Sequence, residues 1–152
     1  MAQLKFVVTG GAGFIGSALV RTLLQHGSVA VIDNLLTGNE ANLKEVRGQI
    51  EFHNVDITNA AALGPLMRGV DTVFHLAAIP SVPRSIDDPV PSHEVNIDGT
   101  FNVLRAAAGE KVRRVVYAAS SSAYGDSEIL PKTESMTPRP KSPYAVQKLV
   151  GE

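Results

Sequence analysis

Phe6–Ser17 reads FVVTGGAGFIGS, an apolar run followed at once by closely spaced glycines. The apolar, largely β-branched run predicts a strand that is buried on both faces of a sheet. Apolar residues then recur at helical spacing as far as Leu24, and Gly27 is expected to end that helix. The stretch therefore predicts a tight turn from a buried strand directly into a helix.

This turn has the properties of an anion-binding site. No Ser, Thr, Asp or Asn stands where its side chain would cap the first helical amides, which leaves them free for an external anion. The positive end of the helix dipole adds to the attraction. Two glycine patterns fit, Gly11/Gly13/Gly16 as G-x-G-x-x-G and Gly10/Gly13/Gly16 as G-x-x-G-x-x-G. The alternative, a turn whose glycines serve only packing, fits the flanking strand and helix less well, so the pattern favours a pyrophosphate site.

A second apolar strand, Ser28–Asp33, ends in an acid. In a dinucleotide-binding fold, an acid at this position accepts hydrogen bonds from the adenosine ribose hydroxyls. A carboxylate there repels the extra phosphate of NADP, and no Arg or Lys stands beside Asp33. The sequence therefore predicts NAD as the cofactor. The alternative is that Asp33 only begins the turn Asn34–Gly38.

Composition excludes several classes of protein. A chain of 152 residues can form one domain with a real core. Its net charge of −1 gives no electrostatic footprint for nucleic acid or an anionic membrane. It contains no cysteine, and its four histidines are not spaced as metal ligands. We expect a soluble, cytoplasmic α/β domain without a metal, a nucleic-acid partner or a membrane partner.

Strands and helices are expected to alternate along the rest of the chain. Further strands are expected over Gln49–Val55, Val70–Ala78 and Val112–Ala119, further helices over Ala41–Val46, from Thr58 or Asn59 to Met67 and over Ser92–Ala108, and a loop over Ile79–Pro91. Gly99 lies inside a predicted helix, so another group is expected to approach the backbone there. The alternation predicts a Rossmann-type, doubly wound parallel sheet with strand order 3-2-1-4-5 and the fifth strand at an edge.

Two later segments carry residues suited to chemistry. Ser120–Ser122 follow the fifth predicted strand, at the rim where open α/β sheets bind ligands. Ser142 is a candidate helix cap ahead of Pro143, which places Tyr144 and Lys148 at i and i+4 on one face of the next helix. An ordinary tyrosine has a pKa of about 10, but a neighbouring ammonium and a helix N-terminus both favour the phenolate. The spacing therefore makes Tyr144 a candidate base.

Seven segments together resemble the extended short-chain dehydrogenases/reductases, in the NAD-dependent epimerase/dehydratase family. They are TGGAGFIGS, VIDNLLTG, VDITN, HLAAIPSVPRSIDDP, NIDGT, AASSSAYGD and SPYAVQK. The resemblance implies a catalytic set of Ser120, Tyr144 and Lys148. It implies cofactor contacts from Gly10, Gly13, Phe14, Ile15, Gly16, Asp33, Asn34, Asp56, Ile57, Leu76, Ala77, Ala78, Asn96, Tyr144 and Lys148, and substrate contacts from Ser81, Ser120, Ser121, Ser122 and Tyr144.

Within that family the serine triplet helps to choose the reaction. Sugar-nucleotide 4,6-dehydratases carry an Asp-Glu pair at the positions of Ser121 and Ser122, and decarboxylases typically carry Glu at the latter. The resemblance therefore favours epimerisation at C4 of a UDP-sugar through a transient 4-keto intermediate. The alternatives are a dehydratase, a decarboxylase, a reductase, or a non-catalytic module that senses a dinucleotide or serves as a scaffold.

The resemblance also covers only part of the family's usual length, since its members are roughly twice as long. We therefore expect residues 1–152 to form an incomplete NAD-binding domain, without the C-terminal region that binds the substrate. The 152-residue chain is expected to be inactive alone and, because of its exposed edge strand, to self-associate or to be poorly soluble. The parent protein is expected to be a homodimer.

Overall fold

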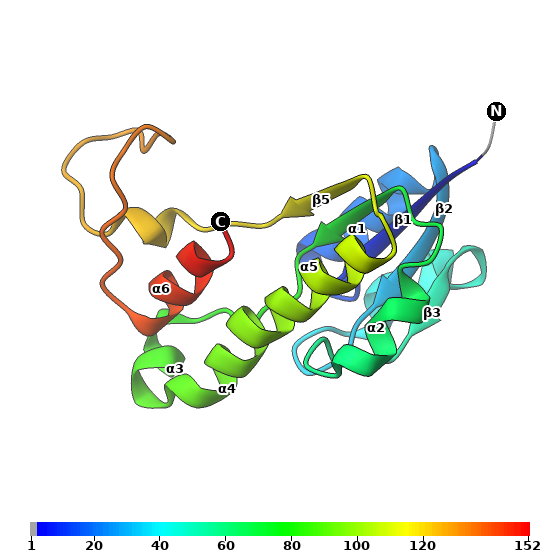
Figure 1. The fold of residues 1–152 in the computed structure, drawn as a ribbon, viewed down its shortest axis with the longest axis horizontal. Coiled ribbons are helices and arrows are strands. Elements are labelled where there is room, and N and C mark those ends of the chain that lie inside the picture. Colours follow the sequence, from blue (N-terminus) through cyan, green and yellow to red (C-terminus); the bar gives the residue numbers. More distant parts are fainter. Residues whose placement is uncertain (1–2) are drawn as a thin grey trace.

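A computed structural model describes residues 3–152 and shows a single parallel sheet (Figure 1). The order of its strands is β3-β2-β1-β4-β5, as the sequence predicts. Leu4 pairs with Gly27 and Thr9 with Ile32, so β1 and β2 run together over their whole length. The bounds are β1 Leu4–Thr9, β2 Gly27–Ile32, β3 Glu51–His53, β4 Thr72–His75 and β5 Arg114–Tyr117.

Helices cover both faces of this sheet. They are α1 Phe14–Leu23, η1 Glu40–Gln49, α2 Ala60–Leu66, α3 Val82–Asp87, α4 Pro89–His93, η2 Glu94–Gly99, α5 Thr100–Gly109, η3 Ser121–Tyr124 and α6 Pro143–Val150. No helix within residues 3–152 is both long and apolar enough to cross a membrane.

The alternation of side chains along β1 divides the core into two layers. Val7 packs with residues of α2 and α5, in a cluster that includes Leu63 and Val103. Its neighbours Phe6 and Val8 point to the opposite face, where they pack with residues of α1 and η1. Both faces of the central strand are therefore buried, as the uninterrupted apolar run predicts.

Three helices lie together beyond the carboxyl ends of β4 and β5. Figure 1 shows α3, α4 and α6 gathered at this end of the molecule, and both α3 and α4 pack directly against α6. The helix that carries Tyr144 and Lys148 is therefore supported by the segment that follows β4.

The prediction of a loop over Ile79–Pro91 is wrong, because this segment contains α3 and the start of α4. Each helix begins in a way that its prolines allow: Pro83 lies in the first turn of α3, and Pro89 begins α4. Ser81 and Asp88 cap the two helices by accepting hydrogen bonds from Arg84 N and Val90 N. Prolines that indicate a loop by composition here begin short helices.

Other boundaries also differ from those predicted. The first helix ends at Leu23 through backbone hydrogen bonds of its last turn, and Gly27 begins the next strand. The helix predicted over Ala41–Val46 is a longer 3-10 helix. Asn59 stands at the cap position of α2 without a side-chain capping bond, and the hydroxyl of Thr58, the other predicted cap, donates to Asp56 Oδ1.

The helix predicted over Ser92–Ala108 is present, but it is built from α4, a π-helical segment and α5. A Cβ atom on Gly99, inside the π segment, would lie 2.7 Å from Cδ1 of Ile57. The predicted close approach to the backbone at Gly99 is confirmed.

Candidate active site

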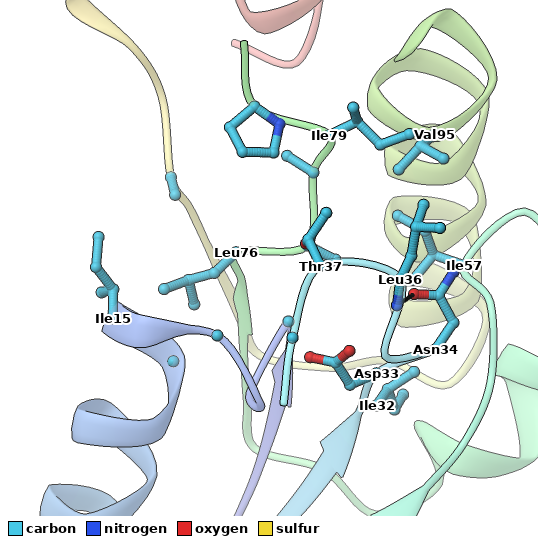
Figure 2. Close-up of a pocket in the computed structure, with 18 of the residues that line it drawn as sticks. Ile15, Ile32, Asp33, Asn34, Leu36, Thr37, Ile57, Leu76, Ile79 and Val95 are labelled. Carbon is cyan, nitrogen blue, oxygen red and sulfur yellow. Dashed lines mark hydrogen bonds between the residues drawn. The ribbon is translucent and has the colours of Figure 1, made fainter. Parts of the chain in front are cut away.

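A cavity of about 470 Å³ lies at the carboxyl ends of the central strands (Figure 2). Most of the cofactor residues expected from the sequence line it: Gly10, Gly13, Phe14, Ile15, Gly16, Asp33, Asn34, Asp56, Ile57, Leu76, Ala77, Ala78, Tyr144 and Lys148. Five expected residues do not line it, namely Asn96, Ser81, Ser120, Ser121 and Ser122. The fold therefore brings the glycine turn and the Tyr144–Lys148 pair to one cavity, although they are far apart in sequence.

The glycine turn packs too closely for side chains at three of its positions. Gly10 has a φ of 71°, and a Cβ there would lie 2.7 Å from the backbone nitrogen of Ala77. A Cβ on Gly16 would run into the carbonyl oxygen of Gly10. Gly11 differs, because it packs against the side chain of Val31 and does not line the cavity. The geometry favours the Gly10/Gly13/Gly16 pattern as the one that faces a ligand.

The start of α1 has no side-chain cap. Gly13 occupies the cap position, and no side chain accepts a hydrogen bond from the first turn. Those amides therefore point their partial positive charge at the cavity, which is the arrangement that binds phosphate groups at helix N-termini.

Asp33 directly follows β2, beside this turn (Figure 2), and its carboxylate is buried. One oxygen accepts a hydrogen bond from Ala12 N at 2.9 Å and the other from Leu35 N at 2.8 Å. Each oxygen keeps acceptor capacity for a further donor. Among the described residues that line the cavity, Lys148 is the one basic side chain, and it belongs to the opposite end.

Asn34 and Asp56 join the ends of β2 and β3. The side-chain amide of Asn34 donates to Asp56 Oδ2 at 2.7 Å. Partial burial raises the pKa of Asp56, but hydrogen bonds from Thr58 and Asn34 outweigh this effect, and the pKa is lowered. The two residues form a polar wall beside Ile57. The arrangement suits a flat heterocycle that has one polar edge and apolar faces.

The N-terminus of α6 is held from two directions. Ser142 Oγ accepts a hydrogen bond from Ala145 N at 3.1 Å, which confirms the predicted cap. Ser85 of α3 accepts a hydrogen bond from another amide of the first turn, Tyr144 N, at 3.0 Å. Its own hydroxyl donates to Val82 O at 2.8 Å. Ser85 is fully buried. The sequence did not predict its contact with Tyr144, because the two residues are far apart along the chain.

Lys148 is only 4% exposed. Burial lowers its pKa to about 8, while Glu152 acts in the opposite direction. Its ammonium lies 4.3 Å from the centre of the Tyr117 ring, and Tyr117 donates its hydroxyl proton to the backbone oxygen of Lys148 at 3.2 Å. A buried ammonium that lines the same cavity as Tyr144 is suited to stabilising negative charge on a nearby oxygen.

A buried chain of side-chain amides connects α6 to the cavity wall. Asn96 donates to Gln147 Oε1 at 3.0 Å, and Gln147 donates in turn to Ser92 Oγ at 3.0 Å. Asn96 also bonds both backbone groups of Ile79, which lines the cavity. The position of Asn96 is thus behind the wall and not on its surface.

His75 lies at the end of β4 and has no counterpart in the sequence-based site. It is fully buried between Thr9 Oγ1, 2.6 Å from Nδ1, and Thr100 Oγ1, 2.9 Å from Nε2. Burial, and to a smaller extent Lys148, lower its pKa to about 3. A neutral imidazole therefore lies beneath the lysine at ordinary pH.

The remaining predicted serines have local partners. Ser120 caps η3 by accepting a hydrogen bond from Ser122 N at 3.3 Å, and the two hydroxyl oxygens are 2.7 Å apart. Ser81 caps α3 with a φ of 144°. Within residues 3–152, no three His, Cys, Asp or Glu side chains are grouped so that they could hold a metal.

Comparison with known proteins gives one family over nearly the whole chain. The model of the NAD dependent epimerase/dehydratase family matches residues 6–152. UDP-glucose 4-epimerase of Mycolicibacterium smegmatis is 42% identical over 98% of this chain and 49% of its own length. The chain thus spans about half the length of the curated relatives it matches.

Solved structures agree with this result. UDP-N-acetylglucosamine 4-epimerase of Methanobrevibacter ruminantium superposes with a TM-score of 0.93 at 37% identity, over 100% of this chain and 49% of that one. The dTDP-glucose 4,6-dehydratase DesIV of Streptomyces venezuelae, solved with NAD bound, superposes with a TM-score of 0.92 at 39% identity. The match covers 97% of this chain and 49% of that one. Epimerases and a dehydratase are thus similar to this chain by the same measures.

Proposed function

The chain belongs to the NAD dependent epimerase/dehydratase family, and we propose that the protein carrying it is an NAD-dependent 4-epimerase of UDP-sugars. The observation that carries the proposal is that Tyr144 and Lys148 line the same cavity as the uncapped glycine turn. A sensor of dinucleotides requires only the turn. A base beside the cofactor site is required only for chemistry.

NAD, the cofactor of this family, fits the residues that line the cavity. Gly10, Gly13 and Gly16 line the cavity beside the uncapped start of α1, where a pyrophosphate could approach the free amides closely. Asp33 retains acceptor capacity for a ribose diol, and Asn34 with Asp56 offers a polar edge for adenine. When bound, NAD supplies a reversible acceptor of hydride.

The chain's own residues then handle the proton and the orientation of the sugar. Tyr144 would remove the proton from the sugar 4-hydroxyl and return it after the sugar has rotated to present its opposite face. Lys148 would hold the nicotinamide ribose and stabilise the tyrosinate through its positive charge. Ser120 would donate to the reacting oxygen once its bond to Ser122 is exchanged for one to the sugar.

Epimerisation is favoured over dehydration by the serines that follow β5. Loss of water from a sugar requires an additional acid and base, and Ser121 and Ser122 supply neither at neutral pH. The similarity to DesIV keeps a 4,6-dehydratase as the second candidate.

We also propose that two regions of the longer protein bind the cofactor and the sugar separately. Residues 1–152 would form the cofactor-binding part, and a further region would complete the sugar pocket. We propose a homodimer for the whole protein. The substrate could carry an N-acetylhexosamine, a hexose or a uronate.

The test separates cofactor binding from turnover. Calorimetric titration of the 152-residue chain with NADH and NADPH should show a clear preference for NADH; equal binding would contradict the role of Asp33. The longest natural protein that contains the sequence should then be incubated with UDP-glucose, UDP-N-acetylglucosamine and UDP-glucuronate. Proton NMR should detect the C4 epimer, and appearance of a 4-keto-6-deoxy product instead would establish the dehydratase.

A further inference from the structure

Tyr117, the last residue of β5, lies directly against Lys148 although it does not line the cavity. Its ring centre is 4.3 Å from the lysine ammonium, a distance at which the negative face of an aromatic ring attracts a cation. Its hydroxyl donates to the backbone oxygen of the same residue at 3.2 Å. Tyr117 therefore contacts both the ammonium group and the backbone oxygen of Lys148.

The surroundings of Tyr117 fix the ring in place. The His75 ring lies on one side, with its centre 5.7 Å away. The end of α6 presses on the ring, since a Cβ on Gly151 would lie 2.7 Å from its Cε1 atom. The half-buried ring is therefore packed on two sides, and its face lies toward the ammonium.

Tyr117 also keeps its neutral form. Burial, followed by the nearby Tyr144 and Glu152, raises its pKa to about 12. The titratable groups that face Lys148 are His75 from β4, Tyr117 from β5, Tyr144 from α6 itself, and Glu152 beyond it. Among the groups on the two strands, His75 carries no charge above its low pKa, so the ring of Tyr117 is the one attractive partner from the sheet.

We propose that Tyr117 is a positioning residue that keeps Lys148 charged and aimed at the cavity through the face of its ring. It acts through Lys148 and touches neither cofactor nor substrate. The inference rests on the proposed function for its consequence in turnover, but the charge of Lys148 can be measured without turnover.

The experiment changes the ring's electrons without changing its shape. Phenylalanine and its mono-, di- and trifluorinated analogues are placed at position 117 of the longest natural protein that contains the sequence, labelled with ¹³Cε-lysine. The Lys148 resonance is assigned by its loss in Lys148→Met, and its pKa is measured by NMR titration. Val116→Leu, a change on the neighbouring residue of the same strand, serves as the control.

Tyr117→Phe should retain the pKa of Lys148 within a few tenths, since the ring remains. Successive fluorination should lower that pKa stepwise by about 0.5 to 1.5 in total, because each fluorine weakens the negative face of the ring. Val116→Leu should leave it unchanged. A Lys148 pKa that stays constant across the fluorinated series would overturn the proposal, whether or not the protein proves to be an epimerase.

Discussion

The two ends of the cavity are held in place by different forces. At the glycine turn, Gly10 and Gly16 fit because nothing projects from them, and the contacts that matter are between backbone atoms. At α6, the position of Tyr144 and Lys148 depends on hydrogen bonds with side chains of other elements: Ser85 accepts one from Tyr144 N, and Tyr117 donates one to Lys148 O. The cofactor end is therefore rigid by close packing, whereas the catalytic end is positioned by polar contacts.

The largest effect is expected from a substitution that removes the proposed base and leaves the contacts of Ser85 and Tyr117 with α6 in place. Tyr144→Phe in the longest natural protein should lower turnover by about 10²- to 10⁴-fold, because it removes only the phenol oxygen. Calorimetry should show nearly unchanged affinity for NAD. Near-normal turnover would mean that another group is the base.

The packed end can be broken by a single methyl group. Gly16→Ala should lower the free energy of unfolding by about 2–3 kcal/mol, since the new Cβ meets the carbonyl oxygen of Gly10. Affinity for NAD should fall with it. Urea denaturation measures the first effect.

A matched glycine serves as the control for that substitution. Gly109→Ala, at the end of α5, meets no atom within 4 Å outside its chain neighbours and its own helix backbone, so the chain should become more stable by about 0.5–1 kcal/mol. Equal destabilisation by the two changes would show that close packing is not what the turn requires.

The buried His75 gives the polar end a dependence on pH. Its pKa of about 3 lies below the ordinary 6.5, so the unfolded chain takes up the proton first as pH falls. This contribution to stability is present above about pH 6.5 and should fall by about 2 kcal/mol on going to about pH 5. When the free energy of unfolding is plotted against pH across this window, the plot should be flatter for His75→Gln. An unchanged pH dependence in this variant would rule out His75 as the cause.

The smallest expected effect tests a single hydrogen bond at α6. Ser85→Ala leaves the amide of Tyr144 without its acceptor and should reduce stability by about 1 kcal/mol. Turnover should fall more than NAD affinity, because the bond lies at the catalytic end. Ser135→Ala, at an exposed serine, should change neither quantity. Equal losses in turnover for the two variants would contradict a positioning role for Ser85.

The comparison also explains what could be predicted from the sequence. The glycine pattern and the Ser142 cap could be predicted because each is visible in a short stretch of sequence, whereas the contacts of Gly10 with Ala77 and of Asp33 with Ala12 are not. The parallel order of the strands followed from the alternation of elements and is confirmed.

The supports of α6 could not be predicted because their partners are distant. Ser85 meets Tyr144 across 59 residues, and Tyr117 meets Lys148 across 31. Neither pair forms a periodic pattern, and Ser85 falls in a segment whose prolines suggested a loop. Asn96 was placed near the cofactor by resemblance, but that prediction did not include its bonds to Ile79 and Gln147.

Asp33 shows how the turn is prepared before any ligand arrives. Its two oxygens already tie Ala12 and Leu35 together, so the segment on either side is ordered by bonds within the protein. Ordering a mobile loop on association usually costs about 0.5–1.5 kcal/mol for each immobilised side chain, and here that entropy has been lost during folding. Binding of the cofactor should therefore require no slow ordering of this segment, and it should appear as a single fast phase in stopped-flow fluorescence.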